Sequence, residues 1–216
     1  LNGRGFDVNT LTLNTKSTIS SIEIVGKTIN NLYLDGLLSK KKYDGVITVN
    51  DEEAKGKITG KIDFSTKKIL ADINGNIDYL NLSYFGVPGN GKAIFSGDVD
   101  GKIAFTTVND MNLDAKLNNV VFTANNQKIE VPDGQVKAFF ENGERIVSVD
   151  MPNVVKGNIS GKYNLGDLGK MFQNGFNKIL VGNPERRYFK NQQFTYKFDV
   201  SQQLVNYFEP NLKIND

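Results

Sequence analysis

The stretch GKITGKIDF, residues 56–64, alternates between apolar and polar positions with a period of two. One face carries Gly56, Ile58, Gly60, Ile62 and Phe64, and the other face carries only polar or charged side chains. This alternation predicts a half-buried β-strand. Glycine weakens the interior of a strand, so two glycines on the apolar side of one strand restrict the folds in which that strand is useful.

The same arrangement, Gly-x-Φ-x-Gly-x-Φ-x-Φ with Φ apolar or aromatic, occurs twice more. It is found in GDVDGKIAF, residues 97–105, and in GNISGKYNL, residues 157–165. The spacing between the copies is not constant, which disfavours a short-period solenoid. One copy alone could be an ordinary strand with glycine at a bulge, but three copies with the same facing indicate a shared role.

Composition excludes several functional classes. The 216 residues contain 26 basic and 24 acidic side chains, interspersed along the chain, which gives no electrostatic argument for binding nucleic acid. There is no Cys and no His, so thiol nucleophiles, imidazole bases and disulfides are excluded, and a zinc site is not expected. Asp and Glu are plentiful but form no recognisable catalytic pair. We therefore predict no catalytic residues, no metal site and no cofactor, and a protein that is not an enzyme.

The ends and the cellular setting give weaker indications. The first residues, LNGRGFDVN, contain neither an initiator Met nor a signal peptide, so we expect a piece of a longer protein whose targeting segments lie elsewhere. No apolar run approaches the ~20 residues of a membrane-spanning helix. The absence of Cys fits an oxidising compartment such as a periplasm.

Most of the chain is predicted to form a meander of antiparallel strands. A doubled Asn118-Asn119 shifts the apolar phase of one strand and predicts a bulge, and Asn142-Gly143 predicts a type I′ hairpin turn. Residues 1–42 are expected to form a looser set of short strands. The remaining predicted strands are 43–50, 56–64, 69–82, 92–105, 111–124, 136–140, 145–151, 157–165 and 193–200.

Two helices are predicted near the C-terminal end. Asp167 can cap a segment at 167–181 in which Leu168, Met171, Phe172, Phe176, Ile179 and Leu180 recur at helical spacing. We expect Phe172, Phe176 and Leu180 to cover a sheet rather than to bind a membrane. A short helical turn is expected from Gln202 to Phe208, ending before Pro210.

Many antiparallel strands with one apolar face need a cover for that face. One helix of about 15 residues spans roughly 22 Å and is too small to cover them all. The sheet must either close as a sandwich or barrel, or curl into an open trough whose inner face meets a ligand. Glycines on the apolar side favour the trough, because they let a sheet coil tightly and leave volume inside. The predicted fold class is therefore mostly β, a curled antiparallel β-groove with a hydrophobic lumen plus one amphipathic helix near 167–181.

The groove is expected to be one continuous unit over 1–216. Its sub-blocks are predicted at 1–83 and 92–165, separated by a linker at 84–91 that contains Pro88, Gly89, Asn90 and Gly91. Residues 185–216 are predicted to begin a further repeat.

Three segments carry a family resemblance. They are GKTINNLYLDGLLSKKKYDGVITVNDEEAKGKITGKIDF at 26–64, GNISGKYNLGDLGKMFQNGFNKIL at 157–180 and FTYKFDVSQQLVNYFEPNLKI at 194–214, together with the repeated glycine strands. In this order they resemble the TamB family (translocation and assembly module), in its Bacteroidota form, within the AsmA-like superfamily of bridge-like lipid transfer proteins. The resemblance covers essentially the whole chain and rests on the order of these motifs.

The resemblance implies a "β-taco" groove that carries glycerophospholipids across the periplasm to the outer membrane. It also implies an anchor in the inner membrane and a TamA-type outer-membrane barrel partner, both through regions outside this chain. Under this hypothesis phospholipid acyl chains would contact a set of inner residues: Ile58, Gly60, Ile62, Phe64, Ile73, Ile77, Val99, Gly101, Ile103, Phe105, Leu113, Leu117, Ile159, Gly161, Tyr163 and Leu165.

Alternatives remain open at this stage. Each of those residues could equally be plain core. The chain could also be a scaffold that offers strand edges to unfolded outer-membrane proteins by β-augmentation. An outer-membrane barrel would need girdles of interfacial aromatics, whereas Trp is absent and Tyr is scattered. Lys40-Lys41-Lys42 and Arg186-Arg187 could contact phosphate head groups, although solvated loops are the more common setting for such runs.

Overall fold

A computed structural model describes residues 2–4, 7, 9–24, 26–85, 92–124, 127–165, 167, 191–208 and 213. Within these residues twelve antiparallel strands form one sheet in chain order, and the first strand does not pair with the last. The strands are β1 (Asn2–Arg4), β2 (Thr12–Ile24), β3 (Lys27–Ser39), β4 (Lys42–Asn50), β5 (Ala54–Asp63), β6 (Ile69–Asn81), β7 (Ile94–Phe105), β8 (Asn112–Ala124), β9 (Gln127–Glu141), β10 (Glu144–Met151), β11 (Val155–Lys162) and β12 (Gln193–Val200). A 3₁₀ turn, η1 (Val108–Asp110), and a helix, α2 (Gln202–Phe208), complete the described elements.

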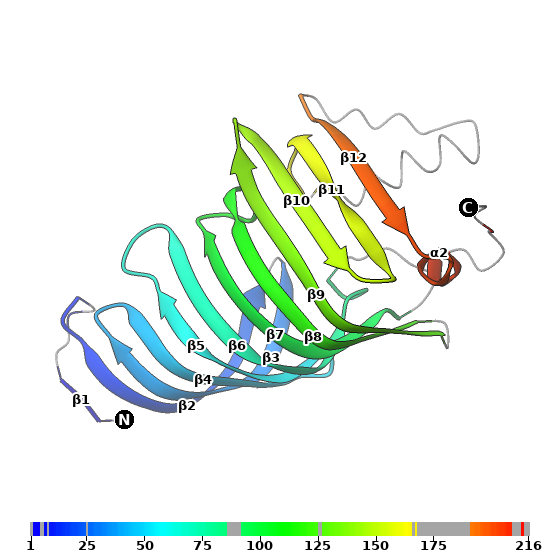
Figure 1. The fold of residues 1–216 in the computed structure, drawn as a ribbon. Coiled ribbons are helices and arrows are strands. Elements are labelled where there is room, and N and C mark those ends of the chain that lie inside the picture. Colours follow the sequence, from blue (N-terminus) through cyan, green and yellow to red (C-terminus); the bar gives the residue numbers. More distant parts are fainter. Residues whose placement is uncertain are drawn as a thin grey trace.

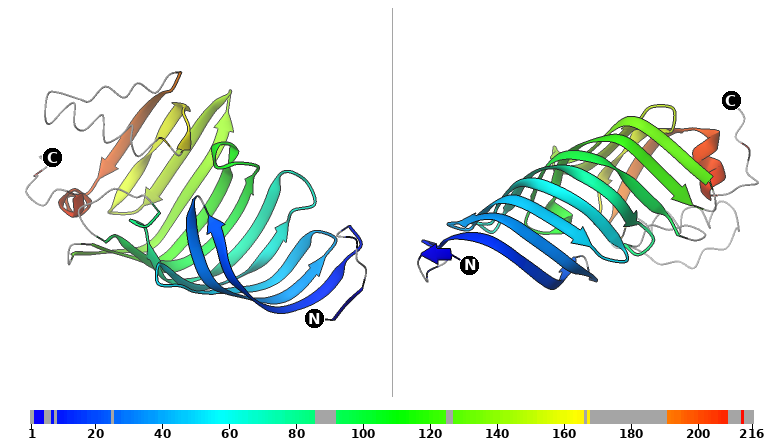
Figure 2. Two further views of the ribbon diagram at one scale, coloured as in Figure 1. Left: turned by 180° about the vertical axis from the view of Figure 1, so that it is seen from behind. Right: turned by 90° about the horizontal axis from the view of Figure 1, so that it is seen from below.

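The sheet is strongly curled, and its strands bow so that the molecule is an elongated open trough (Figures 1 and 2). The first and last strands, β1 and β12, lie at opposite ends of this trough, because each strand pairs only with its neighbours in sequence. The predicted curled, open antiparallel fold is confirmed. The predicted helix at 167–181 lies outside the described residues except for Asp167, and so do positions 86–91 of the expected linker. β6 and β7, on either side of that linker, pair directly.

The prediction of short strands in the first 42 residues is wrong. β2 and β3 are 13 residues long each and pair along almost their whole length. Their many Thr, Ser and Asn side chains hide the apolar alternation, and the phase of β3 also changes at Asn31. Buried Ile29 and buried Leu32 are three residues apart, an odd spacing that a simple period of two does not produce.

Several strands carry a backbone irregularity at the same position along their length, and they bend there. Asn31 in β3 and Asn119 in β8 adopt left-handed backbone conformations, with φ of 55° and 52°. The register of β7 against β8 shifts between Ser96 and Asp98, which confirms the bulge predicted at Asn118-Asn119. Bulges bend and twist a strand, so these positions, which we call the bend line, divide the trough into a first and a second wall.

The two faces of the sheet differ in exposure. Along β5, Gly56, Ile58, Gly60 and Ile62 are half-buried, while the lysines between them are exposed. The less exposed face of an open curved sheet is its concave face, because side chains converge there. The apolar face is therefore the inner face, and charged side chains cover the outer face.

The densest packing lies beyond the bend line, in the second wall. Val120, Ile129 and Val131 are each only 1% exposed, and the Phe95 and Phe122 rings meet edge to face at 5.4 Å. Helix α2 adds Leu204 to this core, as expected for a short helix at Gln202–Phe208. The hydrophobic core thus lies mainly in the second wall of β7–β10.

The β4–β5 hairpin ends before the second wall, and its polar turn lies between the longer strands β3 and β6. Asp51 is buried and accepts hydrogen bonds from the Asn30 backbone amide and side chain at 2.8 and 2.9 Å, and from the Glu53 amide at 2.7 Å. The amide of Asn81 donates to the Glu53 carbonyl at 2.9 Å. This turn therefore links β3 to β6 at a level where β4 and β5 no longer lie between them.

Candidate binding groove

One continuous row of mostly apolar side chains crosses the inner face. Each residue is the direct cross-strand partner of the next, and β2 through β12 contribute one residue each. We call it the apolar row, and its members in order are Leu13, Leu38, Tyr43, Ile62, Ala71, Ile103, Leu113, Ala138, Val147, Ile159 and Tyr196.

The length of this row exceeds that of one acyl chain. Ten intervals between neighbouring strands, at ~4.8 Å each, give roughly 48 Å. The hydrocarbon core of a bilayer is ~30 Å thick and contains two leaflets, so one acyl chain needs about 15 Å. The apolar row is therefore about three acyl-chain lengths long.

A second row, one step toward the bend line, contains five glycines among its eleven residues. It runs through Thr15, Gly36, Gly45, Gly60, Ile73, Gly101, Ala115, Val136, Val149, Gly157 and Phe198. We call it the glycine row. Its glycines follow one another most closely at Gly36, Gly45 and Gly60 in β3–β5, where the row carries no side chains of its own.

Close packing explains several of these glycines. A methyl group on Gly60 would clash with the carbonyl oxygen of Asp72 in the next strand, and one on Gly45 would lie 2.5 Å from the Cα of Gly36. Only glycine allows the backbones to curl together this tightly. On Gly101, by contrast, the nearest atom would be the Ala115 Cβ at 3.3 Å.

Aromatic rings cover the glycine row near its two ends. The Tyr43 hydroxyl lies 2.8 Å from where a Cβ of Gly45 would sit and donates a hydrogen bond to the Val46 carbonyl at 2.8 Å. Burial raises the pKa of this phenol, which keeps it protonated as the donor. At the other end, Phe198 packs directly over Gly157. Both rings fill space that the missing side chains leave.

The three glycine repeats do not share one register. Gly60 and Gly101 lie in the glycine row on either side of Ile73, and the first two repeats therefore align. In the third repeat it is the first glycine, Gly157, that occupies this row, so this copy is shifted by four residues along its strand. Gly161 lies closer to the strand ends, opposite Arg145.

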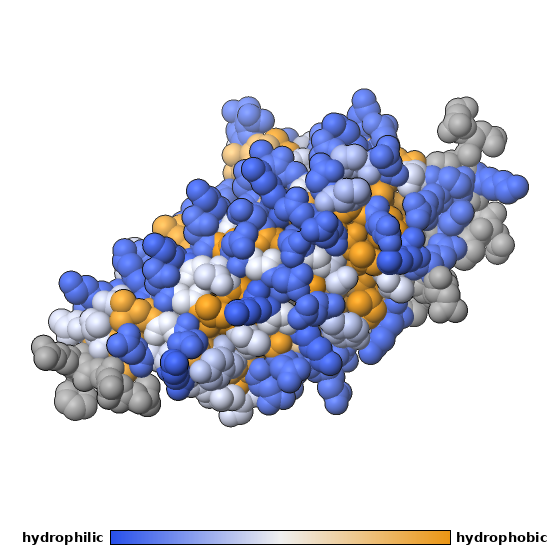
Figure 3. Space-filling model, turned by 60° about the horizontal axis from the view of Figure 1, so that its bottom comes forward, coloured by the Kyte–Doolittle hydropathy of each residue, from blue (hydrophilic) through white to orange (hydrophobic). Residues whose placement is uncertain are grey.

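The inner face changes character along the trough. Inner side chains of β5 and β6 are partly exposed, whereas Ala138 and Ile159, in the same apolar row, are 3% and 5% exposed. The groove is thus open at β5–β8, where Ile62, Ala71, Ile103 and Leu113 are partly exposed, and filled by its own side chains toward β9–β11. In one view of the surface, apolar side chains lie between hydrophilic ones along the length of the molecule (Figure 3).

The predicted groove residues separate into two groups. Those within strands lie on the inner face, and they are Ile58, Gly60, Ile62, Ile73, Ile77, Val99, Gly101, Ile103, Phe105, Leu113, Leu117, Ile159 and Gly161. Three lie just beyond strand ends, namely Phe64, Tyr163 and Leu165. Arg186-Arg187 lie outside the described residues. Tyr43 and Ala71 belong to the apolar row, but the sequence argument did not select them.

A buried cation sits at the strand-end margin of the inner face. We call this margin the first rim; it carries the turns at 40–41, 64–68, 106–111 and 142–143. Arg145 is 1% exposed, donates to the carbonyls of Asn109 and Met111, and lies 4.4 Å from the Phe140 ring centroid. Burial lowers the pKa of its guanidinium. Arg145 therefore ties the β7–β8 turn to the rim of β9 and β10.

The outer face carries a row of alternating charge. Asp44, Lys61, Asp72, Lys102, Asp114 and Lys137 are successive cross-strand partners from β4 to β9. Ion pairs join Lys61 to Asp44 at 3.4 Å, Lys102 to Asp72 at 3.8 Å and Lys137 to Asp114 at 3.6 Å. Each exposed pair contributes little by itself. The alternation penalises strand slippage, because a shifted register would oppose like charges.

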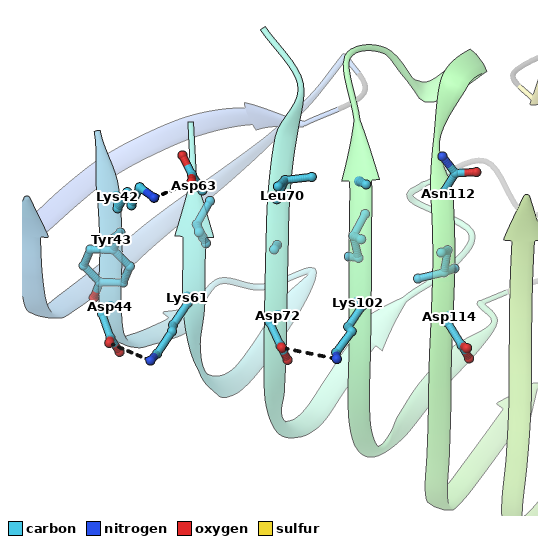
Figure 4. A pocket seen from close by; sticks show the side chains of 15 residues that line it. Lys42, Tyr43, Asp44, Lys61, Asp63, Leu70, Asp72, Lys102, Asn112 and Asp114 are labelled. Carbon is cyan, nitrogen blue, oxygen red and sulfur yellow. Dashed lines mark ion pairs between the residues drawn. The ribbon is translucent and has the colours of Figure 1, made fainter. Parts of the chain in front are cut away.

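A shallow hollow of about 570 Å³ lies along this row (Figure 4). Three cross-strand rows line it, namely the charged row from Asp44 to Asp114, the part of the apolar row from Tyr43 to Leu113, and a further row from Lys42 and Asp63 to Leu70, Ala104 and Asn112. The Lys42 ammonium pairs with Asp63 at 2.9 Å. Six of its seven charged side chains are paired with one another, and the hollow follows the same β4–β8 stretch as the apolar row.

No protein-family model, curated protein or solved structure matches this chain. Among the residues that the structure describes, no helix has the length and apolarity to cross a membrane. The same residues hold no group of three or more acidic, His or Cys side chains that could bind a metal ion.

Proposed function

We propose that the inner face is a lipid-binding groove and that the protein is a segment of a conduit for glycerophospholipids. The observation that carries the proposal is the apolar row, which continues without a charged residue from Leu13 to Tyr196. Burying one methylene is worth ~0.8 kcal/mol, so two acyl chains laid against this row would be held firmly.

The apolar row suits movement of a lipid as well as binding. Apolar contact is non-directional, and a chain that slides along the row exchanges one aliphatic neighbour for another. The row is roughly 48 Å long, which exceeds what a carrier of one lipid needs. The open stretch at β5–β8 offers a place where acyl chains could enter from the side.

The setting of the conduit is proposed on the sequence resemblance alone. By that resemblance it would stand in a periplasm, anchored in the inner membrane and contacting a TamA-type outer-membrane barrel through other regions. No catalytic step is proposed.

Native mass spectrometry of the purified chain, followed by organic extraction, tests the proposal. We expect bound diacyl lipid, and we expect uptake of fluorescent phospholipid from vesicles by lipid-free protein. Protein that takes up no lipid in either experiment would refute the conduit. Tight binding of an unfolded outer-membrane protein without lipid would instead support the scaffold alternative.

A further inference from the structure

The β3–β4 hairpin is closed by a turn whose sequence does not suit its backbone. Ser39 pairs with Lys42, so Lys40 and Lys41 form a two-residue loop, and both have positive φ, 50° and 61°. Such loops favour Asn-Gly, and the β9–β10 hairpin of this protein does use Asn142-Gly143. Lysine in a left-handed conformation is strained, and strain of this kind suggests a role for the side chains.

The neighbouring loop adds to the same charge. Lys67 and Lys68 lie in the β5–β6 loop, whose first residue, Phe64, donates its amide proton to the Lys41 carbonyl at 2.9 Å. We call residues 38–43 and 64–70 the basic rim. Together with Asp63 they contain five lysines and one acid, a net charge of 5 − 1 = +4, whereas the whole chain has a net charge of only +2. Positive charge is therefore concentrated on one part of the first rim.

Large apolar side chains are exposed beside these lysines. Phe64 is 38% and Leu70 48% exposed, and Leu37, two residues before the Lys-Lys turn begins at Ser39, is 40% exposed. Val108 of the adjoining β7–β8 turn is 40% exposed as well. The rim thus combines ammonium groups with aromatic and aliphatic groups in the turns and in the strand ends beside them.

We propose that the basic rim docks onto the surface of an anionic lipid bilayer. Lysines near such a surface are attracted by its negative potential, and exposed Phe and Leu can enter the boundary between head groups and acyl chains. Turn tips project outward and present no unpaired strand edge, which suits a soft lipid surface better than a polypeptide partner. This inference does not depend on lipid lying in the groove.

Vesicle flotation with the whole chain tests the inference. The protein is mixed with vesicles of phosphatidylcholine, or of phosphatidylcholine with phosphatidylglycerol. The double variant Lys40→Asn/Lys41→Gly copies the turn at 142–143 and removes two charges. Each lysine near an anionic surface contributes on the order of fivefold in affinity, so we expect roughly thirty-fold weaker binding to the anionic vesicles. Thermal melting of this variant should occur at a higher temperature, because the turn is relieved of strain.

A matched control removes the same charge elsewhere. Lys55→Asn/Lys57→Asn alters two exposed lysines on the outer face of β5 and should bind as the wild type does. We expect Phe64→Ser/Leu70→Ser to weaken vesicle binding by more than an increase in ionic strength weakens the binding of the wild type. The inference would be overturned by equal binding to neutral and anionic vesicles, or by a loss in the Lys55→Asn/Lys57→Asn control as large as that in Lys40→Asn/Lys41→Gly. Binding only to inorganic phosphate or only to an acidic polypeptide would also overturn it.

Discussion

Ile62 of β5 and Ile103 of β7 lie in one row of the inner face, separated only by Ala71 of β6. Both side chains are half-buried. The two glycine repeats therefore place their equivalent isoleucines against the same stretch of the groove, and a ligand lying along the row would contact both.

Carboxylates at these two positions should block lipid without unfolding the protein. In Ile62→Glu and Ile103→Glu the charge can stay hydrated at the open part of the groove, so we expect stability losses below about 2 kcal/mol. An acyl chain would have to pass an ionised group, which is very costly without a partner, so bound lipid should fall at least tenfold. Lipid extraction and circular dichroism measure the two effects.

Ile159 is the contrast within the same row, since it is only 5% exposed. Ile159→Glu should destabilise by about 4 kcal/mol or more, because the carboxylate would be buried without a partner. If Ile62→Glu also unfolds the protein, that part of the row is closed core. Full lipid binding with both open-site carboxylates in place would contradict the groove.

The glycine row makes a second prediction, with two neighbouring sites as a matched pair. Gly60→Ala should destabilise the protein by about 1–3 kcal/mol, because the new methyl group meets the backbone of β6. Gly101→Ala should change stability by less than about 1 kcal/mol, since its nearest neighbour is a methyl group at 3.3 Å. Chemical denaturation of both variants checks this. Equal effects would mean that tight curling at Gly60 is not what requires glycine there.

The sequence was informative where its signals are local. Period-two alternation identified the inner face of β5, β7 and β11, Asn142-Gly143 marked its turn, and Asn118-Asn119 marked the bulge. The same alternation failed in β2 and β3, because Thr and Ser occupy positions on both faces and Asn31 changes the phase.

The rows themselves depend on strand register, which local signals do not contain. Nothing near Tyr43 indicates that its ring lies over Gly36 and Gly45, because that contact requires Gly36 to face Gly45 across β3 and β4. The four-residue shift of the third repeat arises in the same way, from turn lengths and pairings summed over several strands. Arg145 was missed because a single arginine among strand residues has no motif, and its partners are the carbonyls of a turn more than 30 residues away.

Arg145 should be a structural cation of the first rim. Arg145→Ala leaves the carbonyls of Asn109 and Met111 without their donor and removes the group that stacks on Phe140, so we expect a loss of about 3 kcal/mol. Arg145→Lys keeps the charge but not the planar fork, and its loss should be intermediate. Urea unfolding measures both. A change below ~0.5 kcal/mol in Arg145→Ala would show that the β7–β8 turn does not need this contact.

Asp51 should make stability depend on pH in the acid range. Burial acts to raise the pKa of its carboxyl group, but hydrogen bonds from Glu53 and Asn30 outweigh this, and the net effect is a lowered pKa. A carboxyl whose pKa is lower in the folded protein stabilises it above the unfolded-state value of about 3.9. That stabilisation should be lost as the pH falls through the folded-state pKa.

The measurement compares acid unfolding of wild type and Asp51→Asn between about pH 5 and pH 2. At neutral pH we expect the variant to be less stable by about 1–3 kcal/mol, because an amide cannot accept from all three donors that face Asp51. Its stability should also fall less steeply with acid.

Asp63 titrates in the same window, since hydrogen bonds from the Ser65 side chain and from Lys42 lower its pKa to about 2, so only the difference between the two proteins is diagnostic. Asp100→Asn, on the exposed outer face of β7, is the control. Parallel acid profiles for wild type and Asp51→Asn would show that the turn joining β3 to β6 does not depend on an ionised Asp51.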